Sequence, residues 1–196
     1  MKKLLQLPFA VIVMFFWIFP ASAEKLDVAI EYKETIGQYI QIYQSDDSHA
    51  SMRDALDAFN KGHFALSANS VINFGIGSKP VWLALQISNS GETATHRNLL
   101  FETAWLDKID VYFLQRDQVI NSYHTGDSLP FSERPLNHRF FVMGHDFAQG
   151  ETTILIRIES ADAMVLPIYF MSTEKLNDGD VLQAYSYGFM YGVILA

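Results

Sequence analysis

Residues Val81 to Ser88, with the sequence VWLALQIS, decide the fold class of this chain. Val, Leu, Leu and Ile alternate with Trp, Ala, Gln and Ser, and a β-strand places successive side chains on opposite faces of a sheet. The stretch therefore predicts a strand with one apolar face on a core and a mixed face on the other side.

Other stretches share this two-residue period and extend the prediction along the chain. They are Tyr39 to Tyr43, Lys108 to Leu114 and Thr153 to Ile158, with weaker candidates at Asn98 to Glu102, Val119 to Tyr123, Arg139 to Met143 and Val165 to Met171. Turn residues such as Asn89-Ser90-Gly91 and Arg116-Asp117 separate them. About eight strands without regular intervening helices predict an all-β fold, an antiparallel β-sandwich or jelly roll.

One short helix is expected within this β pattern, from Ser51 to Phe59. Ser51 can cap the helix, and Asp54 can return the bond three residues later. Met52, Leu56 and Phe59 share one face at helical spacing. We expect this helix to plug one end or edge of the sandwich.

The first 23 residues have the order of a secretory signal peptide. Lys2 and Lys3 form a positive start, Leu4 to Phe19 is almost wholly apolar, and Ala21-Ser22-Ala23 is a small-residue cleavage site. The alternative is an uncleaved membrane anchor, since the apolar run is nearly long enough to span a bilayer. Either interpretation exports the rest of the chain, so the mature domain is expected to begin at Glu24 and to lie in the periplasm.

The last 16 residues predict a second hydrophobic helix. From Ala184 onward the chain has no charge, and several tyrosines precede the final apolar residues, as at a membrane interface. Gly188 and Gly192 have the spacing that lets membrane helices approach closely. We expect residues 24–180 to be the sandwich and residues 181–196 to begin a transmembrane helix of a larger protein. The alternatives are a C-terminal amphipathic helix packed on the domain, or a dimer helix.

Composition excludes several function classes. The formal net charge is −8, and it becomes −10 when the expected signal peptide, which contains Lys2 and Lys3, is removed. Nucleic-acid binding needs a basic footprint, which this acidic chain lacks. Cysteine is absent, so there is no disulfide framework, thiolate nucleophile or Cys-ligated zinc.

The order of several motifs resembles a known family, the type 2 extracellular domain of the 7TM-DISM receptors. The strand Val81 to Asn89 is similar to that family's Trp-Leu-x-φ-x-φ-x-Asn segment. The resemblance continues through Leu106-Asp107-Lys108-Ile109-Asp110-Val111-Tyr112, Gly126-Asp127, Arg134-Pro135, Thr153 to Ser160, Leu166-Pro167-Ile168 and Tyr187 to Gly192. It implies a jelly roll similar to carbohydrate-binding modules that senses a periplasmic ligand and signals through seven helices of the inner membrane. Members commonly have Arg two residues after the strand Trp, and this chain has Ala84 there.

The mixed face of the sandwich supplies the candidate ligand residues. Trp82, Tyr112 and Arg157 lie on it, and a face with rings, a guanidinium and carboxylates suits a sugar or another small ligand. Trp105 is a further candidate, in a loop before a strand. The alternatives are a buried Trp82, an Arg157 that only pairs with a neighbouring carboxylate, and a Trp105 that caps the core. The ligand-binding hypothesis therefore names Arg157, Tyr112 and Trp105.

No catalytic or metal-binding pattern is found. The six histidines lack the spacings of a metal site, and no nucleophile elbow, P-loop or dinucleotide motif is present. We therefore predict a sensor domain that is not an enzyme and has no cofactor, with an unidentified periplasmic small molecule or glycan as partner. The alternative function is a protein-protein interaction or homodimerisation module that regulates the receptor without a small ligand.

Overall fold

The computed structural model describes residues 24–45, 47–77 and 79–195. The expected signal peptide at residues 1–23 lies outside the described residues. The strands are β1 (Leu26–Asp27), β2 (Gln41–Tyr43), β3 (Ala65–Leu66), β4 (Ile72–Ile76), β5 (Val81–Asn89), β6 (Thr95–Phe101), β7 (Lys108–Gln115), β8 (Gln118–Thr125), β9 (Phe141–Phe147), β10 (Gly150–Glu159), β11 (Ala163–Leu166) and β12 (Ile168–Met171). The helices are α1 (Met52–Asn60) and α2 (Thr173–Leu195), with short 3-10 turns η1 (Gly37–Tyr39) and η2 (Phe131–Glu133).

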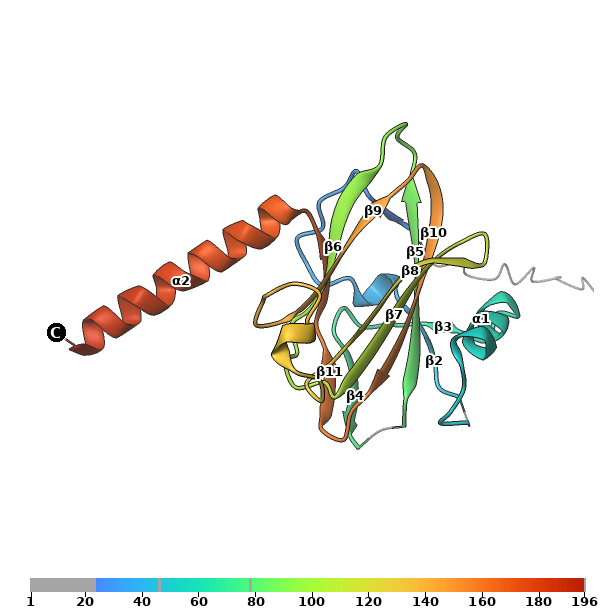
Figure 1. Cartoon of the computed structure of the whole chain (residues 1–196), viewed down its shortest axis with the longest axis horizontal. Coiled ribbons are helices and arrows are strands. Elements are labelled where there is room, and N and C mark those ends of the chain that lie inside the picture. Colours follow the sequence, from blue (N-terminus) through green and yellow to red (C-terminus); the bar gives the residue numbers. More distant parts are fainter. Residues whose placement is uncertain (1–23, 46, 78, 196) are drawn as a thin grey trace, which may run out of the picture.

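The strands form two layers, as the sequence predicted. The larger sheet has the order β3-β2-β5-β10-β7-β8, and β1 joins it parallel to β5. The second layer contains the three-stranded sheet β12-β6-β9 and the pair β11-β4. Every strand pair other than β1 with β5 is antiparallel. The fold is therefore an all-β antiparallel sandwich, with α1 and α2 on opposite sides of it (Figure 1).

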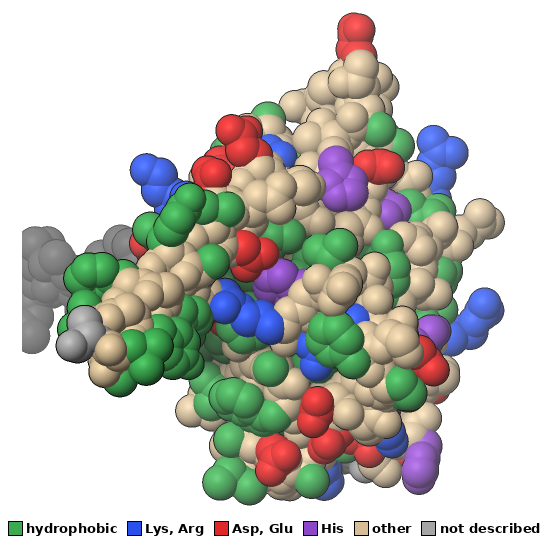
Figure 2. All heavy atoms as spheres, turned by 60° about the vertical axis from the view of Figure 1, so that its left-hand side comes forward, with side chains coloured by type: hydrophobic (Ala, Val, Ile, Leu, Met, Phe, Trp, Pro, Cys, Tyr) green, Lys and Arg blue, Asp and Glu red, His purple; other side chains and the backbone are tan. Residues whose placement is uncertain are grey.

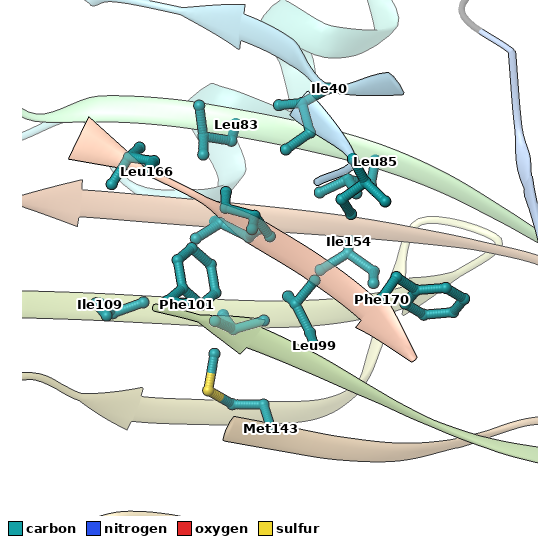
Figure 3. Close-up of a cluster of buried hydrophobic side chains, with 14 of the residues drawn as sticks. Ile40, Leu83, Leu85, Leu99, Phe101, Ile109, Met143, Ile154, Leu166 and Phe170 are labelled. Carbon is teal, nitrogen blue, oxygen red and sulfur yellow. The ribbon is translucent and has the colours of Figure 1, made fainter. Parts of the chain in front are cut away.

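The core lies between the two layers and uses the apolar face predicted for each strand. In register, Ile154 of β10 lies between Leu85 of β5 and Phe113 of β7. These side chains are fully buried and meet Leu99, Phe101, Met143 and Phe170 of the other layer (Figure 3). Each fully buried side chain of this kind contributes about 1.5–3 kcal/mol.

Helix α1 covers the outer face of the larger sheet. Ser51 caps it: the Asp54 amide donates to Ser51 Oγ (3.3 Å), and the Ser51 amide donates to an Asp54 carboxylate oxygen (2.8 Å). The buried face of α1 packs with Trp82, Ala84, Leu114 and Leu155. The capped helix is thus confirmed, but the expectation that it plugs an end or edge is wrong. Strand β5 is consequently buried on both faces over most of its length.

Three predicted strands need correction, one of which, expected from Arg139, starts only at Phe141. The stretch Val165 to Met171 is two strands, because Pro167 lacks an amide hydrogen and the chain changes partner there. Strand β11 pairs with β4, whereas β12 pairs with β6. The strand expected from Tyr39 starts only at Gln41, since Tyr39 closes the η1 turn.

Helix α2 follows β12 directly and extends away from the sandwich (Figure 1). It begins at Thr173, so the polar residues Asn177 to Asp180 are helical. Among its described residues only Leu176 is buried. No helix in the described part of the chain is both long enough and apolar enough to cross a membrane.

Candidate functional site

The outer face of the larger sheet carries two of the three predicted ligand residues. Strand register arranges this face in rows across β5, β10 and β7. One row holds Trp82, Arg157 and Asp110, the next Ala84, Leu155 and Tyr112, and the third Gln86, Thr153 and Leu114. Because α1 packs on apolar members of all three rows, it separates a polar cluster at one end from a groove at the other.

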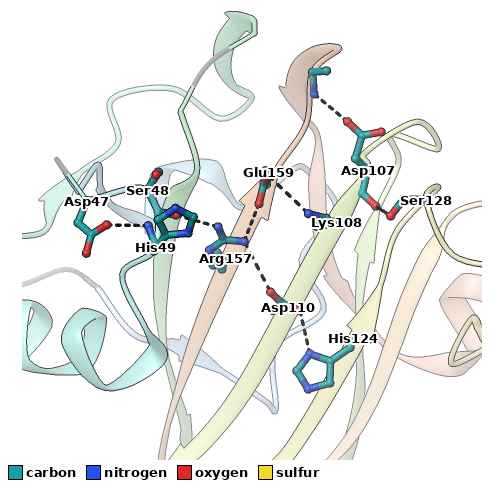
Figure 4. A network of polar contacts seen from close by, with 11 residues as sticks. Asp47, Ser48, His49, Asp107, Lys108, Asp110, His124, Ser128, Arg157 and Glu159 are labelled. Carbon is teal, nitrogen blue, oxygen red and sulfur yellow. Dashed lines mark hydrogen bonds and ion pairs between the residues drawn. The ribbon is translucent and has the colours of Figure 1, made fainter.

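Arg157 is the centre of the polar cluster (Figure 4). Its guanidinium lies 3.0 Å from Glu159 Oε2 and 3.9 Å from Asp110 Oδ2, and it donates to the Ser48 carbonyl oxygen at 3.1 Å. Its side chain is only 17% exposed. Asp110 also lies 2.8 Å from His124 Nδ1. These contacts are those of an ion-pair partner, the alternative considered from the sequence, and a ligand role for Arg157 stays a prediction.

Tyr112 lies one row from Arg157 and is half-buried beside α1. Its ring stacks on Trp82, with 6.4 Å between centroids, and meets the His124 ring edge-on. Burial raises the pKa of the Tyr112 hydroxyl; Asp110 adds to this rise and Arg157 opposes it. Trp82 is itself buried, as in the alternative interpretation of this residue.

Trp105 lies in the β6–β7 loop, away from this face. Its ring is attached to the second layer, because Nε1 donates to the Ala163 carbonyl oxygen at 3.0 Å. Nearby, the Thr103 hydroxyl donates to the Val165 carbonyl oxygen. Trp105 is 49% exposed, so it is neither buried nor part of the Arg157 cluster. The structure therefore brings together Arg157 and Tyr112 but not Trp105.

A groove of about 850 Å³ lies at the other end of the outer face, beyond α1. It is formed by the end of α1, the β7–β8 hairpin and the β9–β10 turn, with Gln86 and Thr153 from the sheet. Its walls are rich in amide and charged side chains around a few apolar ones. They are Asn60, Gln86, Gln115, Gln118 and Gln149, then Arg116, Asp117 and Glu151, and then Phe59, Leu114 and Ile120.

The tip of the β7–β8 hairpin is held in a costly conformation at the rim of this groove. Arg116 and Asp117 have positive φ angles, 49° and 61°; such an angle costs a residue like Arg about 1–2 kcal/mol, whereas Asp adopts it more readily. The tip is tied to α1, because Asn60 Nδ2 donates to Asp117 Oδ2 at 3.3 Å. Both angles are those of a two-residue type I′ hairpin turn, because Gln115 pairs with Gln118 on either side of the tip. The hairpin tip places Arg116 in the wall of the groove.

The sequence predicted some of the residues and turns that form this groove, but not that they come together. The Arg116-Asp117 turn and the outward position of Gln86 were both predicted from the sequence. Only the pairing of β10 with both β5 and β7 brings them to one end of the face. In the described residues, no three His, Cys, Asp or Glu side chains are grouped closely enough to hold a metal ion.

Taken together, these observations define a class of protein, an all-β sandwich domain with a groove on its outer face and a long helix at its end. Residues 37–172 match the family model of the 7TMR-DISM extracellular 2 domain, which is more than half of the chain. The chain belongs to this family, as its motif order had indicated. It is therefore an extracellular sensor domain of a receptor, a type of domain that is generally non-catalytic. No curated protein matches the chain.

Proposed function

We propose that residues 24–180 form a periplasmic ligand-sensing domain without catalytic activity, and that the ligand is a small polar molecule or glycan. The groove on the outer face carries this proposal, because its volume of about 850 Å³ is within the ~300–1,000 Å³ typical of ligand pockets. Its amides and charged groups can donate to and accept from hydroxyls. Phe59 and Ile120 offer apolar surface to the C–H face of a sugar ring.

Arg157 and Tyr112 belong to this proposal as neighbours of the groove on the same face. Leu155 and Leu114 connect the two regions beneath α1. A ligand that displaces α1 would reach the Arg157 cluster, and a ligand that leaves α1 in place would contact the groove alone. Substitutions of Arg157 or Tyr112 should therefore change ligand affinity only if the ligand displaces α1.

Attachment to the inner membrane is the second part of the proposal. We propose that residues 1–23 export the domain and that residues 181–196 begin the first membrane helix. In support, the described residues of α2 from Val181 onward carry no charge and have exposed apolar side chains. These lie on all sides of the helix, an arrangement that favours an apolar environment. The signal would then pass through membrane helices to a cytoplasmic output module.

An exposed apolar patch containing Tyr112, Leu114 and Leu155 would favour the alternative function, docking without a small ligand. Leu114 and Leu155 are buried beneath α1. These residues therefore do not form that patch, and the groove is the feature that favours ligand binding.

A thermal-shift screen tests the proposed function. We expect one class among sugars, carboxylates and short peptides to raise Tm, since a ligand at 100 times its Kd adds about 2.7 kcal/mol of stability. Gln86→Ala and Arg116→Ala should abolish the shift, and Gln38→Ala, an exposed glutamine on η1, should keep it. Either the absence of a shift for every class or a shift that survives both groove substitutions would contradict the proposal.

A further inference from the structure

A second cavity lies on the opposite side of the sandwich, where α2 meets the second layer. Its volume is about 230 Å³. It is enclosed by the first turns of α2, strands β6 and β12, and the chain segments around Lys33 and Arg139. Figure 2 shows this side, with apolar side chains along the outer part of α2 and basic side chains where the helix meets the body.

The floor of this cavity is apolar and fixes the start of α2. Leu176 is 6% exposed and packs with Leu100 and Val142, with Phe140, Tyr169 and Met171 at their edges. Asp180 attaches the next turn of α2 to the sandwich, because its Oδ1 lies 3.0 Å from His138 Nε2 and 3.7 Å from Arg139 Nη2. The root of α2 is therefore anchored to the sandwich, and the uncharged residues 181–195 start beside the cavity.

The walls of the cavity are basic, in an acidic chain. Three of the 14 lysines and arginines line it, namely Lys33, Lys175 and Arg139. Asp180 already pairs with Arg139, whereas Lys33 and Lys175 have no ion-pair partner among the described residues. Glu102 also lines the cavity; burial first, and then this carboxylate, raises the pKa of Tyr169. Two unpaired ammonium groups against one carboxylate leave the cavity suited to an anion.

We propose that this cavity binds the phosphate-bearing headgroup of an anionic membrane lipid. The inference rests on the proposed placement of residues 181–196 in the membrane. Lys33 and Lys175 bind the phosphate, and Tyr169 and Met171 contact the glycerol and the first carbons of the acyl chains. A volume of about 230 Å³ holds a headgroup but not acyl chains, which continue along the uncharged part of α2. The lipid then braces the helix against the sandwich.

The test uses the full chain in nanodiscs of phosphatidylcholine with increasing phosphatidylglycerol. The probe is the ¹³C-methyl NMR signal of Met171, which lines the cavity. We expect this signal to shift with phosphatidylglycerol content. Lys33→Gln with Lys175→Gln should weaken the apparent affinity about 25-fold, since each basic residue near an anionic surface contributes roughly fivefold. The charge-matched control is Arg53→Gln with Lys61→Gln at α1, on the other side of the sandwich, and it should leave the response unchanged.

The outcomes distinguish a lipid headgroup site from a free-anion site and from general attraction to an anionic surface. Equal responses to phosphatidylglycerol and phosphatidylcholine, or equal affinities for the cavity variant and the control, would overturn the site. If inorganic phosphate or glycerol 3-phosphate shifts Met171 equally in pure phosphatidylcholine discs, the cavity is a free-anion site and the lipid assignment is wrong.

Co-elution with the discs tests the proposed membrane placement separately. If the chain co-elutes but Met171 shows no lipid-dependent shift, the headgroup site is overturned and the membrane placement stands. If the chain fails to co-elute, the membrane placement has failed, and monomeric dihexanoyl phosphatidylglycerol added in solution then tests the cavity itself. No Met171 shift in that titration would overturn the site as well.

Discussion

Arg157→Ala is the substitution that best separates packing from ligand contact on the outer face. It removes a guanidinium that lies 3.0 Å from Glu159 and 3.9 Å from Asp110, and leaves Glu159 with Lys108 and Asp110 with His124 as remaining partners. Loss of one partner of a fully buried ion pair costs about 3–5 kcal/mol, and loss at an exposed pair about 0–1 kcal/mol. The side chains of Arg157, Asp110 and Glu159 are 17%, 26% and 36% exposed, so we expect an intermediate loss of about 2 kcal/mol.

Urea denaturation of the unliganded protein measures this loss. With an m-value of about 2 kcal/mol/M, the midpoint should fall by about 1 M. In a double-mutant cycle, Arg157 should couple more strongly to Glu159 than to the more distant Asp110. The control, Arg53→Ala on the exposed side of α1, should stay within about 0.5 kcal/mol of the parent.

The opposite result would refute this reasoning. If Arg157→Ala leaves the urea midpoint within about 0.2 M of the parent and abolishes the ligand-induced rise in Tm, Arg157 is a ligand contact. Its contacts with Glu159 and Asp110 would then contribute little to stability.

Three further predictions concern stability. Burial lowers the pKa of His145, so the unfolded state binds more protons than the folded state and stability should fall as pH drops below about 6.5. His145→Phe should remove that part of the pH dependence when urea midpoints are compared between pH 8 and pH 5. An unchanged dependence would contradict the prediction. Ser51→Ala, which removes the cap of α1, should cost about 1 kcal/mol in urea denaturation, and an unchanged midpoint would show that α1 is held by packing alone. Gly126→Ala should cost at least about 2 kcal/mol by the same assay, because the φ of Gly126 is 144° and a Cβ would lie 2.1 Å from the Asp107 carbonyl oxygen. The control is Gly179→Ala, which should cost nothing because the space around Gly179 is open.

The sequence predicted the larger sheet well because its central strands alternate strictly. In β5, β7 and β10 every second residue is a large aliphatic or aromatic one, so the core face was evident. Strand β4 was not predicted, since Asn73 and Gly75 interrupt its pattern and Gly75 has a positive φ. It forms a strand because β11 pairs with it, and that contact is remote in sequence.

The candidate site was harder to predict, because it depends on which part of the outer face α1 covers. The helix and the face were each predictable from local patterns, but their packing brings together residues far apart in the chain. Ala84 and Leu155 became buried under α1, and Gln86 was left in the wall of the groove. Ala84 also occupies the position where family members commonly have Arg. In this chain that position is fully buried with α1 packed on it, which accounts for a small apolar residue there.

Several motifs that indicated the family lie together in a hydrogen-bonded cluster that is distant from the groove. The Asp107 carboxylate accepts hydrogen bonds from the Ser160 hydroxyl (3.0 Å) and the Ala161 amide (2.7 Å). The Asp127 amide donates to the Leu106 carbonyl oxygen (2.7 Å). These bonds join the start of β7 to the end of β10 and the loop after β8, so they stabilise the sandwich.

Arg134 has a comparable structural role, since its guanidinium lies over the rings of Phe131 and Phe141. Asp107, Asp127 and Arg134 thus identify the fold, and none of the three lines the groove. The groove is built largely from other positions, because Gln86 occupies a position that the strand motif does not specify and the β7–β8 hairpin tip lies between motifs. If the groove binds a ligand as proposed, the motifs that indicated the family therefore do not specify which ligand it is.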